Sequence, residues 1–323
     1  MVRKPHGLAA AAFAVALSAG WAAFPPSQAL AQAPAAVPAP VPEPMIKPEG
    51  LRQISPHVWA IPDNGVGMVS NIGFIIGTNA TLVVDTGLGA RNGEIVLAQA
   101  RKLAPNNALY IVTTHVHPEH DLGAQAFPAS AKMIRSKSQL EDIAANGMNT
   151  AQAFSGRSPF IADLLKDAKF RDADITYDQA YVLDLGGVTA QMTAMGTNHT
   201  IGDTIIFVPG DRVLFSGDLA MRRGPAMGAP TATFANWYAS FDKMSALNPA
   251  ILVPSHAAFG GPELIDNYRK FFQAAQARTA VLKREGRTAD EAARTLTTEL
   301  TPFFPDGPDR IAGIVRRAYA AAP

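Results

Sequence analysis

The sequence contains no cysteine. Disulfide bonds, thiolate metal ligands and cysteine nucleophiles are therefore excluded together, and any bound metal must be held by nitrogen and oxygen atoms. An excess of one charge is also missing, because 28 Lys and Arg residues balance 27 Asp and Glu residues for a net charge of +1. This balance gives no electrostatic argument for nucleic acid or for an anionic membrane as a partner. The expected partner is a small-molecule substrate.

Long apolar runs are missing as well, apart from residues 8–23. Arg3 and Lys4 precede this run, and Ala29-Leu30-Ala31 follows it as a small-x-small cleavage site. This order predicts a cleaved signal peptide at residues 1–31 rather than a membrane anchor, because the run is short and rich in alanine. The protein is therefore expected in the periplasm or outside the cell, with no membrane association beyond export.

The rest of the chain is predicted to form one domain. Residues 32–50 are rich in Pro and Ala and are expected to be an extended leader. Residues 51–323 show no break in composition, and a chain of this length can bury a full core without disulfide bonds. Predicted strands alternate with predicted helices, which indicates an α/β fold. The segment from about residue 263 is predicted to be helical.

Local patterns predict individual elements. Two apolar strands joined by a polar turn predict a hairpin at residues 73–85. Asn92 is predicted to cap the next helix, and a later helix is expected at residues 138–145, ended by Gly147. Residues 148–180 are less periodic and are expected to include a substrate-facing flap.

The most informative stretch is His-Val-His-Pro-Glu-His at residues 115–120, directly after a predicted buried strand. His115 and His117 are two apart, so in an extended chain their imidazoles leave on the same side. Clustered imidazoles are costly to bury unless they share a partner, and imidazoles with a carboxylate are typical ligands of a divalent transition metal. The stretch therefore predicts a metal site at the end of a strand.

Further polar side chains follow later strands. His199 lies in a glycine-bounded loop, and Asp218 and His256 each follow a short apolar run. Turns after strands are where side chains from different strands can meet. Five of the six histidines after residue 31 belong to this pattern, whereas His57 stands alone and is predicted to be structural.

This ordered set of residues resembles the metallo-β-lactamase-fold superfamily over about residues 51–262. The family's metal motif is H-x-H-x-D-H, followed by single His, Asp and His ligands. Asp85, in Val-Val-Asp-Thr-Gly, matches a motif whose aspartate supports a ligand from outside the metal shell. The resemblance implies a four-layer αβ/βα sandwich with the metal site along one edge of the two sheets. The matching ligand positions here are His115, His117, Glu119, His120, His199, Asp218 and His256.

The resemblance also implies a centre with two Zn²⁺ ions, with iron as the alternative metal. Two such cations lie roughly 3.5–4 Å apart and ionise a bridging water near neutral pH, which gives a hydroxide nucleophile. Glu119 stands where the family usually has aspartate, so we expect a changed affinity for the second metal or a changed rate. Glu119 and Asp218 are the predicted catalytic residues. By the resemblance, one cation is bound by His115, His117 and His199, the other by Glu119, His120 and His256, and Asp218 bridges them.

The sequence restricts the substrate class less than it restricts the metal ligands. True metallo-β-lactamases tend to lack the bridging aspartate, so Asp218 and the absence of cysteine place the chain closer to thioesterases, lactonases and alkylsulfatases. The stretches around His117 and His256 look most similar to periplasmic hydrolases associated with quinoprotein systems, and the ligand pattern also to hydroxyacylglutathione hydrolases. The predicted reaction is hydrolysis of an ester-, thioester-, lactone- or amide-like bond.

Three alternatives stay open: β-lactam hydrolysis, a mononuclear iron persulfide dioxygenase, and a zinc-binding protein without catalysis. The second-metal ligands His120 and His256 argue against the dioxygenase. Specificity is expected to come from loops at residues 63–72, 148–180 and 221–233.

Overall fold

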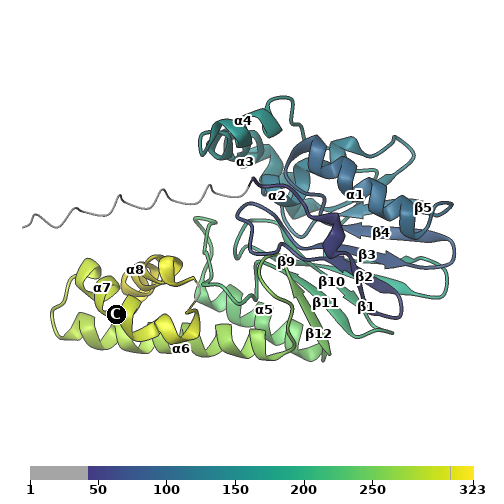
Figure 1. Cartoon of the computed structure of the whole chain (residues 1–323). Coiled ribbons are helices and arrows are strands. Elements are labelled where there is room, and N and C mark those ends of the chain that lie inside the picture. The colour runs from purple at the N-terminus through teal and green to yellow at the C-terminus, as the bar shows by residue number, and fades with distance from the viewer. Residues whose placement is uncertain (1–42, 306) are drawn as a thin grey trace, which may run out of the picture. The chain divides into compact units, whose positions relative to one another are not determined.

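The computed structural model describes residues 43–305 and 307–323. The predicted signal peptide and most of the predicted leader lie outside these residues. Two β-sheets form the centre of the described chain (Figure 1). The first sheet has seven strands in chain order, and the second has five strands in the order β12-β11-β10-β9-β8.

The first sheet is antiparallel in its early half and parallel from the fourth strand onward. The hairpin predicted at residues 73–85 is confirmed, because the third and fourth strands of the sheet pair directly across the turn. The strands of the first sheet are β1 (Arg52–Ser55), β2 (Val58–Ile61), β3 (Ile72–Ile76), β4 (Ala80–Val84), β5 (Ala108–Val112), β6 (Lys132–Ser136) and β7 (Ile175–Tyr177).

The second sheet is antiparallel except for its last pair, which is parallel. A parallel pair needs a crossover connection, and a helix provides it here. The strands are β8 (Ala180–Asp184), β9 (Thr189–Gly196), β10 (Asp203–Val208), β11 (Val213–Gly217) and β12 (Ile251–Pro254).

The two sheets pack face to face through an apolar core. Leu82 and Val112 of the first sheet share this core with Ile206 and Phe215 of the second. Gly73 makes the close approach possible, because a Cβ at this position would lie 2.3 Å from the Phe215 ring. Strands buried on both faces explain why the sequence showed apolar runs rather than strict alternation.

Helices cover the outer face of each sheet (Figure 1). The first sheet is covered by α1 (Gly89–Leu103), with Val96 and Ala100 packed against Phe74, Val83 and Ile111. The second sheet is covered by α5 (Phe234–Ala246) and α6 (Glu263–Arg284), whose buried aromatic side chains form one apolar cluster with strand residues. The predicted four-layer αβ/βα sandwich is therefore confirmed.

The C-terminal helical region is also confirmed. Its helices pack on one another beyond the second sheet, and a capping box between Thr288 and Glu291 opens α7 (Ala289–Leu300). None of the helices in the described part of the chain combines the length and the apolar character that a bilayer crossing needs. These elements are α5 (Phe234–Ala246), α6 (Glu263–Arg284), α7 (Ala289–Leu300), η3 (Thr301–Phe303), η4 (Pro308–Arg310) and α8 (Ile311–Ala321).

Two predicted helix boundaries are wrong. Helix α1 begins at Gly89, so Asn92 lies inside it, where its side chain accepts a hydrogen bond from the backbone N–H of Ile46 at 2.8 Å. The predicted end at Gly147 also fails, because α3 (Lys137–Ser155) continues through it. A Cβ at Gly147 would lie 2.8 Å from the Phe170 ring, so the glycine serves helix packing. The remaining short helices are η1 (Pro48–Gly50), α2 (Pro118–Asp121), η2 (Leu122–Ala126) and α4 (Pro159–Leu165).

Candidate metal centre

The seven predicted ligands come together where strands of both sheets end. Four of them lie in the turn and the short helix α2 that follow β5, and one each follows β9, β11 and β12. Six of the seven are buried, and His117 is half-buried. The structure therefore places every predicted ligand in one cluster, although they span 142 positions of the chain from His115 to His256.

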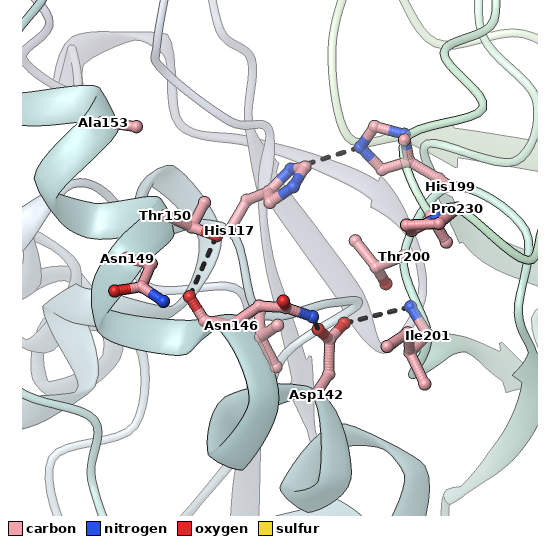
Figure 2. A pocket seen from close by; sticks show the side chains of 13 residues that line it. His117, Asp142, Asn146, Asn149, Thr150, Ala153, His199, Thr200, Ile201 and Pro230 are labelled. Carbon is pink, nitrogen blue, oxygen red and sulfur yellow. Dashed lines mark hydrogen bonds between the residues drawn. The ribbon is translucent and has the colours of Figure 1, made fainter.

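Three imidazoles form the first ligand group. His115 Nε2 lies 3.1 Å from His117 Nδ1, which in turn lies 3.2 Å from His199 Nε2. Ligand atoms in a tetrahedral shell are about 3.3 Å apart when each is roughly 2.0–2.1 Å from zinc. The three nitrogen atoms therefore have the spacing of a coordination shell, and Figure 2 shows the rings of His117 and His199 facing each other.

The second ligand group is wider. Glu119 Oε1 lies 3.9 Å from His120 Nε2 and 4.0 Å from His256 Nε2. Asp218 lies between the two groups, with Oδ2 3.3 Å from His199 Nε2 and Oδ1 3.9 Å from His256 Nε2. Glutamate at position 119 therefore still directs its carboxylate into the second group, despite its additional methylene.

Several inward-facing atoms of this cluster lack a partner within the described chain. Glu119 Oε2, His120 Nε2 and Asp218 Oδ1 are buried and make no hydrogen bond there. Leaving such atoms unsatisfied is costly, and one of them belongs to a carboxylate that could bridge two cations. Nitrogen and carboxylate oxygen donors suit zinc and other divalent transition metals. The residues present therefore fit a two-metal site.

The outward-facing ring nitrogens explain why the inward-facing ones are free to bind. His199 Nδ1 lies 2.7 Å from the carbonyl oxygen of Ala226, and His256 Nδ1 lies 2.8 Å from that of Val69. A carbonyl oxygen can only accept, so each of these Nδ1 atoms carries the proton and donates. The Nε2 atom of each ring then presents a lone pair to the centre.

Asp85 supports a third imidazole in the same way. Its Oδ2 lies 2.9 Å from His120 Nδ1, and its Oδ1 accepts a hydrogen bond from the backbone N–H of Thr114 at 2.7 Å. Asp85 itself has a left-handed backbone with φ of 61°, a conformation that costs free energy in a residue other than glycine. The carboxylate therefore lies behind His120, hydrogen-bonded to its Nδ1 and to Thr114.

Burial and neighbouring charges shift the pKa values of the cluster in different directions. Burial lowers the pKa of His115 and His117, and neighbouring imidazoles lower it further, so both are neutral ligands. Burial also opposes protonation of His120, but the Asp85 carboxylate raises its pKa to about 9. Burial would raise the pKa of Asp218, yet the imidazoles of His199, His256 and His120 and the guanidinium of Arg310 hold that pKa well below its usual range.

Two supporting carboxylates were not identified from the sequence. Asp203 accepts hydrogen bonds from the backbone N–H of His199 at 2.7 Å and from the Thr200 hydroxyl at 2.6 Å, and so fixes the loop that carries a ligand. Asp121 forms a fully buried ion pair with Arg135 directly after the metal motif. The position of Asp203 four residues after His199 was a signal, since a short polar loop needs such an acceptor.

A cavity of about 400 Å³ adjoins the first ligand group. Figure 2 shows Asn146, Asn149 and Thr150 of α3 on one side and His199 on the other, with His117 between them. Part of residues 148–180, the region predicted to include a flap, therefore lines this cavity as a helix rather than a loop. The loop at residues 221–233 contributes Gly228, Ala229 and Pro230 to the same wall.

Arg222 and Arg223, a basic pair in the same loop, do not line this cavity. Arg222 is outside this cavity, with its guanidinium 3.5 Å from Glu263 on the surface. The backbone carbonyl of Arg223 accepts a hydrogen bond from the Tyr268 hydroxyl. His57 also lies apart from the metal cluster, where its Nδ1 is 2.7 Å from Asp211.

Residues 65–256, more than half of the chain, match the family model of the metallo-beta-lactamase superfamily. The chain belongs to this superfamily. The predicted resemblance is thereby confirmed. Among curated proteins, the chain is 23% identical over 209 residues to a linear primary-alkylsulfatase of Pseudomonas sp. (strain ATCC 19151). That alignment covers 54% of this chain and 39% of the relative, so the chain spans about two fifths of the relative's length.

Solved structures show the same fold. A stereoselective inverting sec-alkylsulfatase from Pseudomonas sp. superposes with a TM-score of 0.64 at 16% identity, over 84% of this chain and 50% of that one. A metallo-beta-lactamase from Pontibacter korlensis superposes with a TM-score of 0.53 at 18% identity, over 67% of this chain and 94% of that one. Identities this low establish shared architecture, and the reaction has to be argued from the site.

Proposed function

We propose that this protein is a hydrolase that depends on two divalent cations, with Zn²⁺ as the resident metal. The observation that carries the proposal is the cluster of seven ligand side chains, in which Glu119 Oε2, His120 Nε2 and Asp218 Oδ1 are buried without a hydrogen-bond partner in the described chain. When bound, two such cations supply Lewis acidity and a water that ionises near neutral pH. An all nitrogen and oxygen donor set favours zinc, and iron remains the alternative metal.

The side chains have distinct tasks in this proposal. Asp218 lies between the ligand groups and would hold both cations at a fixed separation. Glu119 Oε2 has no partner within the described chain, and this oxygen would orient the attacking water. Asp85 keeps His120 in the tautomer that binds metal. Burial of the cluster excludes bulk water and strengthens each of these interactions.

The proposed substrates contain an ester-, thioester-, lactone- or amide-like bond. Sulfate esters come first among these, because the curated relative is named an alkylsulfatase and a sec-alkylsulfatase shares the fold over 84% of this chain. The cavity beside His117 and His199 would hold the organic part of the substrate. Export to the periplasm, as the N-terminal sequence predicts, would place the enzyme where such molecules arrive from outside.

β-Lactam hydrolysis is the second candidate. It is supported by the superposition on a metallo-beta-lactamase over 94% of that protein's length. Asp218 argues against β-lactam hydrolysis, because by the resemblance a bridging aspartate is typical of the thioesterases, lactonases and alkylsulfatases of the family rather than of true metallo-β-lactamases.

Metal analysis followed by a substrate panel tests the proposal. The mature protein, purified from the periplasm without added metal, should contain about two zinc ions per chain and hydrolyse at least one ester. Turnover should disappear after chelation and return with Zn²⁺. One iron per chain with no hydrolysis would move the assignment to oxygen chemistry, and intact zinc without turnover on sulfate esters, carboxylate esters, thioesters, lactones and lactams would indicate a binding protein. Hydrolysis of a β-lactam alone would support the second candidate.

A further inference from the structure

Arg310 brings a positive charge to the candidate metal centre from the C-terminal region. It ends η4 and directly precedes α8, so it lies well outside the residues 65–256 that match the superfamily. Its Nη1 atom is 3.9 Å from Asp218 Oδ2, and the side chain is 28% exposed, against 3% for Asp218. One residue thus connects the solvent side of the C-terminal helices with the bridging carboxylate.

The Nη1 atom of Arg310 is buried and has no hydrogen-bond partner among the residues that the structure describes. A separation of 3.9 Å from Asp218 is too long for a hydrogen bond. The buried guanidinium of Arg135, by contrast, has acceptors: it donates to both carboxylate oxygens of Asp121, at 2.5 and 2.8 Å. A buried N–H of a charged group without an acceptor is costly, so Arg310 is a donor in need of an external acceptor.

The same side chain forms part of the wall of a second cavity. This cavity has a volume of about 280 Å³ and lies between the loop at residues 225–228 and the start of α8. Met227, Ile314 and Pro225 give it apolar surface, and Arg310, Arg317 and Asp309 give it charge. The donors of Arg317 are used, because its guanidinium binds backbone carbonyls of residues 229–232. Arg310 is therefore the cationic group of this wall with a donor to offer.

We propose that Arg310 binds a compact oxyanion of the substrate, a sulfate or a carboxylate, next to Asp218. This inference rests on the proposed hydrolase function and narrows its substrates to anionic esters with a short apolar part. A planar guanidinium matches two oxygens of such an anion. Its charge adds to that of the resident cations, so the surroundings favour an anion over a neutral ester. The apolar wall of this second cavity takes the carbon chain next to the anion, and the cavity beside His117 and His199 takes the part of the substrate across the scissile bond.

The test compares Arg310→Gln and Arg310→Lys with a matched control, Arg316→Gln. Arg316 lies on α8, is exposed and pairs with Asp290 on the surface, so its change removes the same charge away from the site. Zinc content is measured first for each protein. Hydrolysis is then followed with 4-nitrophenyl sulfate, with an ester that carries a free carboxylate, and with neutral 4-nitrophenyl acetate.

Arg310→Gln should lower kcat/KM for the anionic esters by about 10- to 100-fold, in line with the loss of a charge-assisted hydrogen bond, and change the neutral ester by less than about threefold. Arg310→Lys should restore part of the loss, and Arg316→Gln should behave as wild type. The two anionic esters show whether sulfate or carboxylate is preferred. Equal losses on anionic and neutral esters, or none on either, would overturn the proposal.

A binding measurement separates this inference from the hydrolase function. Inorganic sulfate and acetate are titrated into the zinc-loaded proteins by calorimetry, whether or not any ester turns over. Affinity for at least one anion should fall about tenfold or more in Arg310→Gln at unchanged zinc content. If Arg310→Gln binds both anions as tightly as wild type, the inference is wrong even when hydrolysis is established. If no ester is hydrolysed but anion binding depends on Arg310, the hydrolase function fails and the anion site stands.

Discussion

Glu119 is the residue at which this chain departs from the pattern of its superfamily. Its carboxylate reaches the second ligand group with separations of 3.9 and 4.0 Å, which are longer than those within the first group. A shorter side chain on the same backbone would withdraw the oxygen further. The local backbone is thus adapted to glutamate, and restoring the usual aspartate should weaken the site rather than improve it.

We therefore predict that Glu119→Asp lowers the affinity for the second cation by about tenfold or more, while the first stays bound. Competition with a zinc-binding dye measures both affinities. Glu119→Gln is the control, because it keeps the length and removes the charge, and it should also empty the second site. Two zinc ions bound as tightly as in wild type, with an unchanged rate, would show that the methylene has no effect.

Asp85 offers a second test at the scale of one residue. Asp85→Asn keeps the shape but replaces the acceptor that orients His120, so metal affinity at the second group should fall by about 10- to 100-fold. Asp211→Asn is a matched control, since Asp211 is a buried carboxylate that binds His57 Nδ1 at 2.7 Å far from the ligands. If Asp85→Asn and Asp211→Asn bind metal with equal affinity, Asp85 does not support the second ligand group.

At the scale of elements, the strands were predictable and so were the ligands at their ends. Short apolar runs followed by a polar turn are a local signal, and His199, Asp218 and His256 all carry it. The C-terminal end of α3 was not predictable. A glycine inside a helix costs only about 1 kcal/mol, and the close contact between Gly147 and the Phe170 ring favours glycine at this position. Arg310 gave no signal either, since its approach to Asp218 depends on how the C-terminal helices pack.

The loop at residues 225–232 links one of those helices to a metal ligand. Its Ala226 carbonyl accepts from His199 Nδ1, and the N–H of Ala229 donates to the His199 carbonyl. Arg317 of α8 holds the same loop through three backbone carbonyls, the shortest contact being 3.0 Å to Ala229. The position of His199 thus depends on a side chain 118 residues further along the chain.

Arg317→Gln should loosen this loop, destabilise the fold by about 1–2 kcal/mol and weaken cation binding at the first group. Urea unfolding of the chelated protein gives the first quantity, and zinc competition gives the second. Arg316→Gln, one residue earlier and on the surface, should leave both unchanged. A metal affinity in Arg317→Gln that matches the control would mean that His199 is positioned without the loop.

At the scale of the whole molecule, the candidate metal centre joins the two sheets. His115, His117, Glu119 and His120 follow a strand of the first sheet, whereas His199, Asp218 and His256 follow strands of the second. Bound cations would therefore crosslink the sheets at one edge, where the described chain otherwise leaves buried polar atoms unsatisfied. Any ion that binds the folded chain and not the unfolded one stabilises the fold by mass action.

Removal of the metal should consequently lower the melting temperature as well as abolish turnover. A free cation concentration 1,000 times its dissociation constant contributes about 4 kcal/mol, which corresponds to a shift of roughly 7 °C for a domain of this size. Calorimetric scans with chelator and after return of Zn²⁺ measure the shift, and Ca²⁺ should not replace Zn²⁺ at nitrogen ligands. His57→Gln should keep the full shift because His57 lies outside the cluster, and His115→Gln should lose most of it. An equal melting temperature with and without zinc would mean that the two sheets hold together without the metal, and that the ligand groups contribute to chemistry alone.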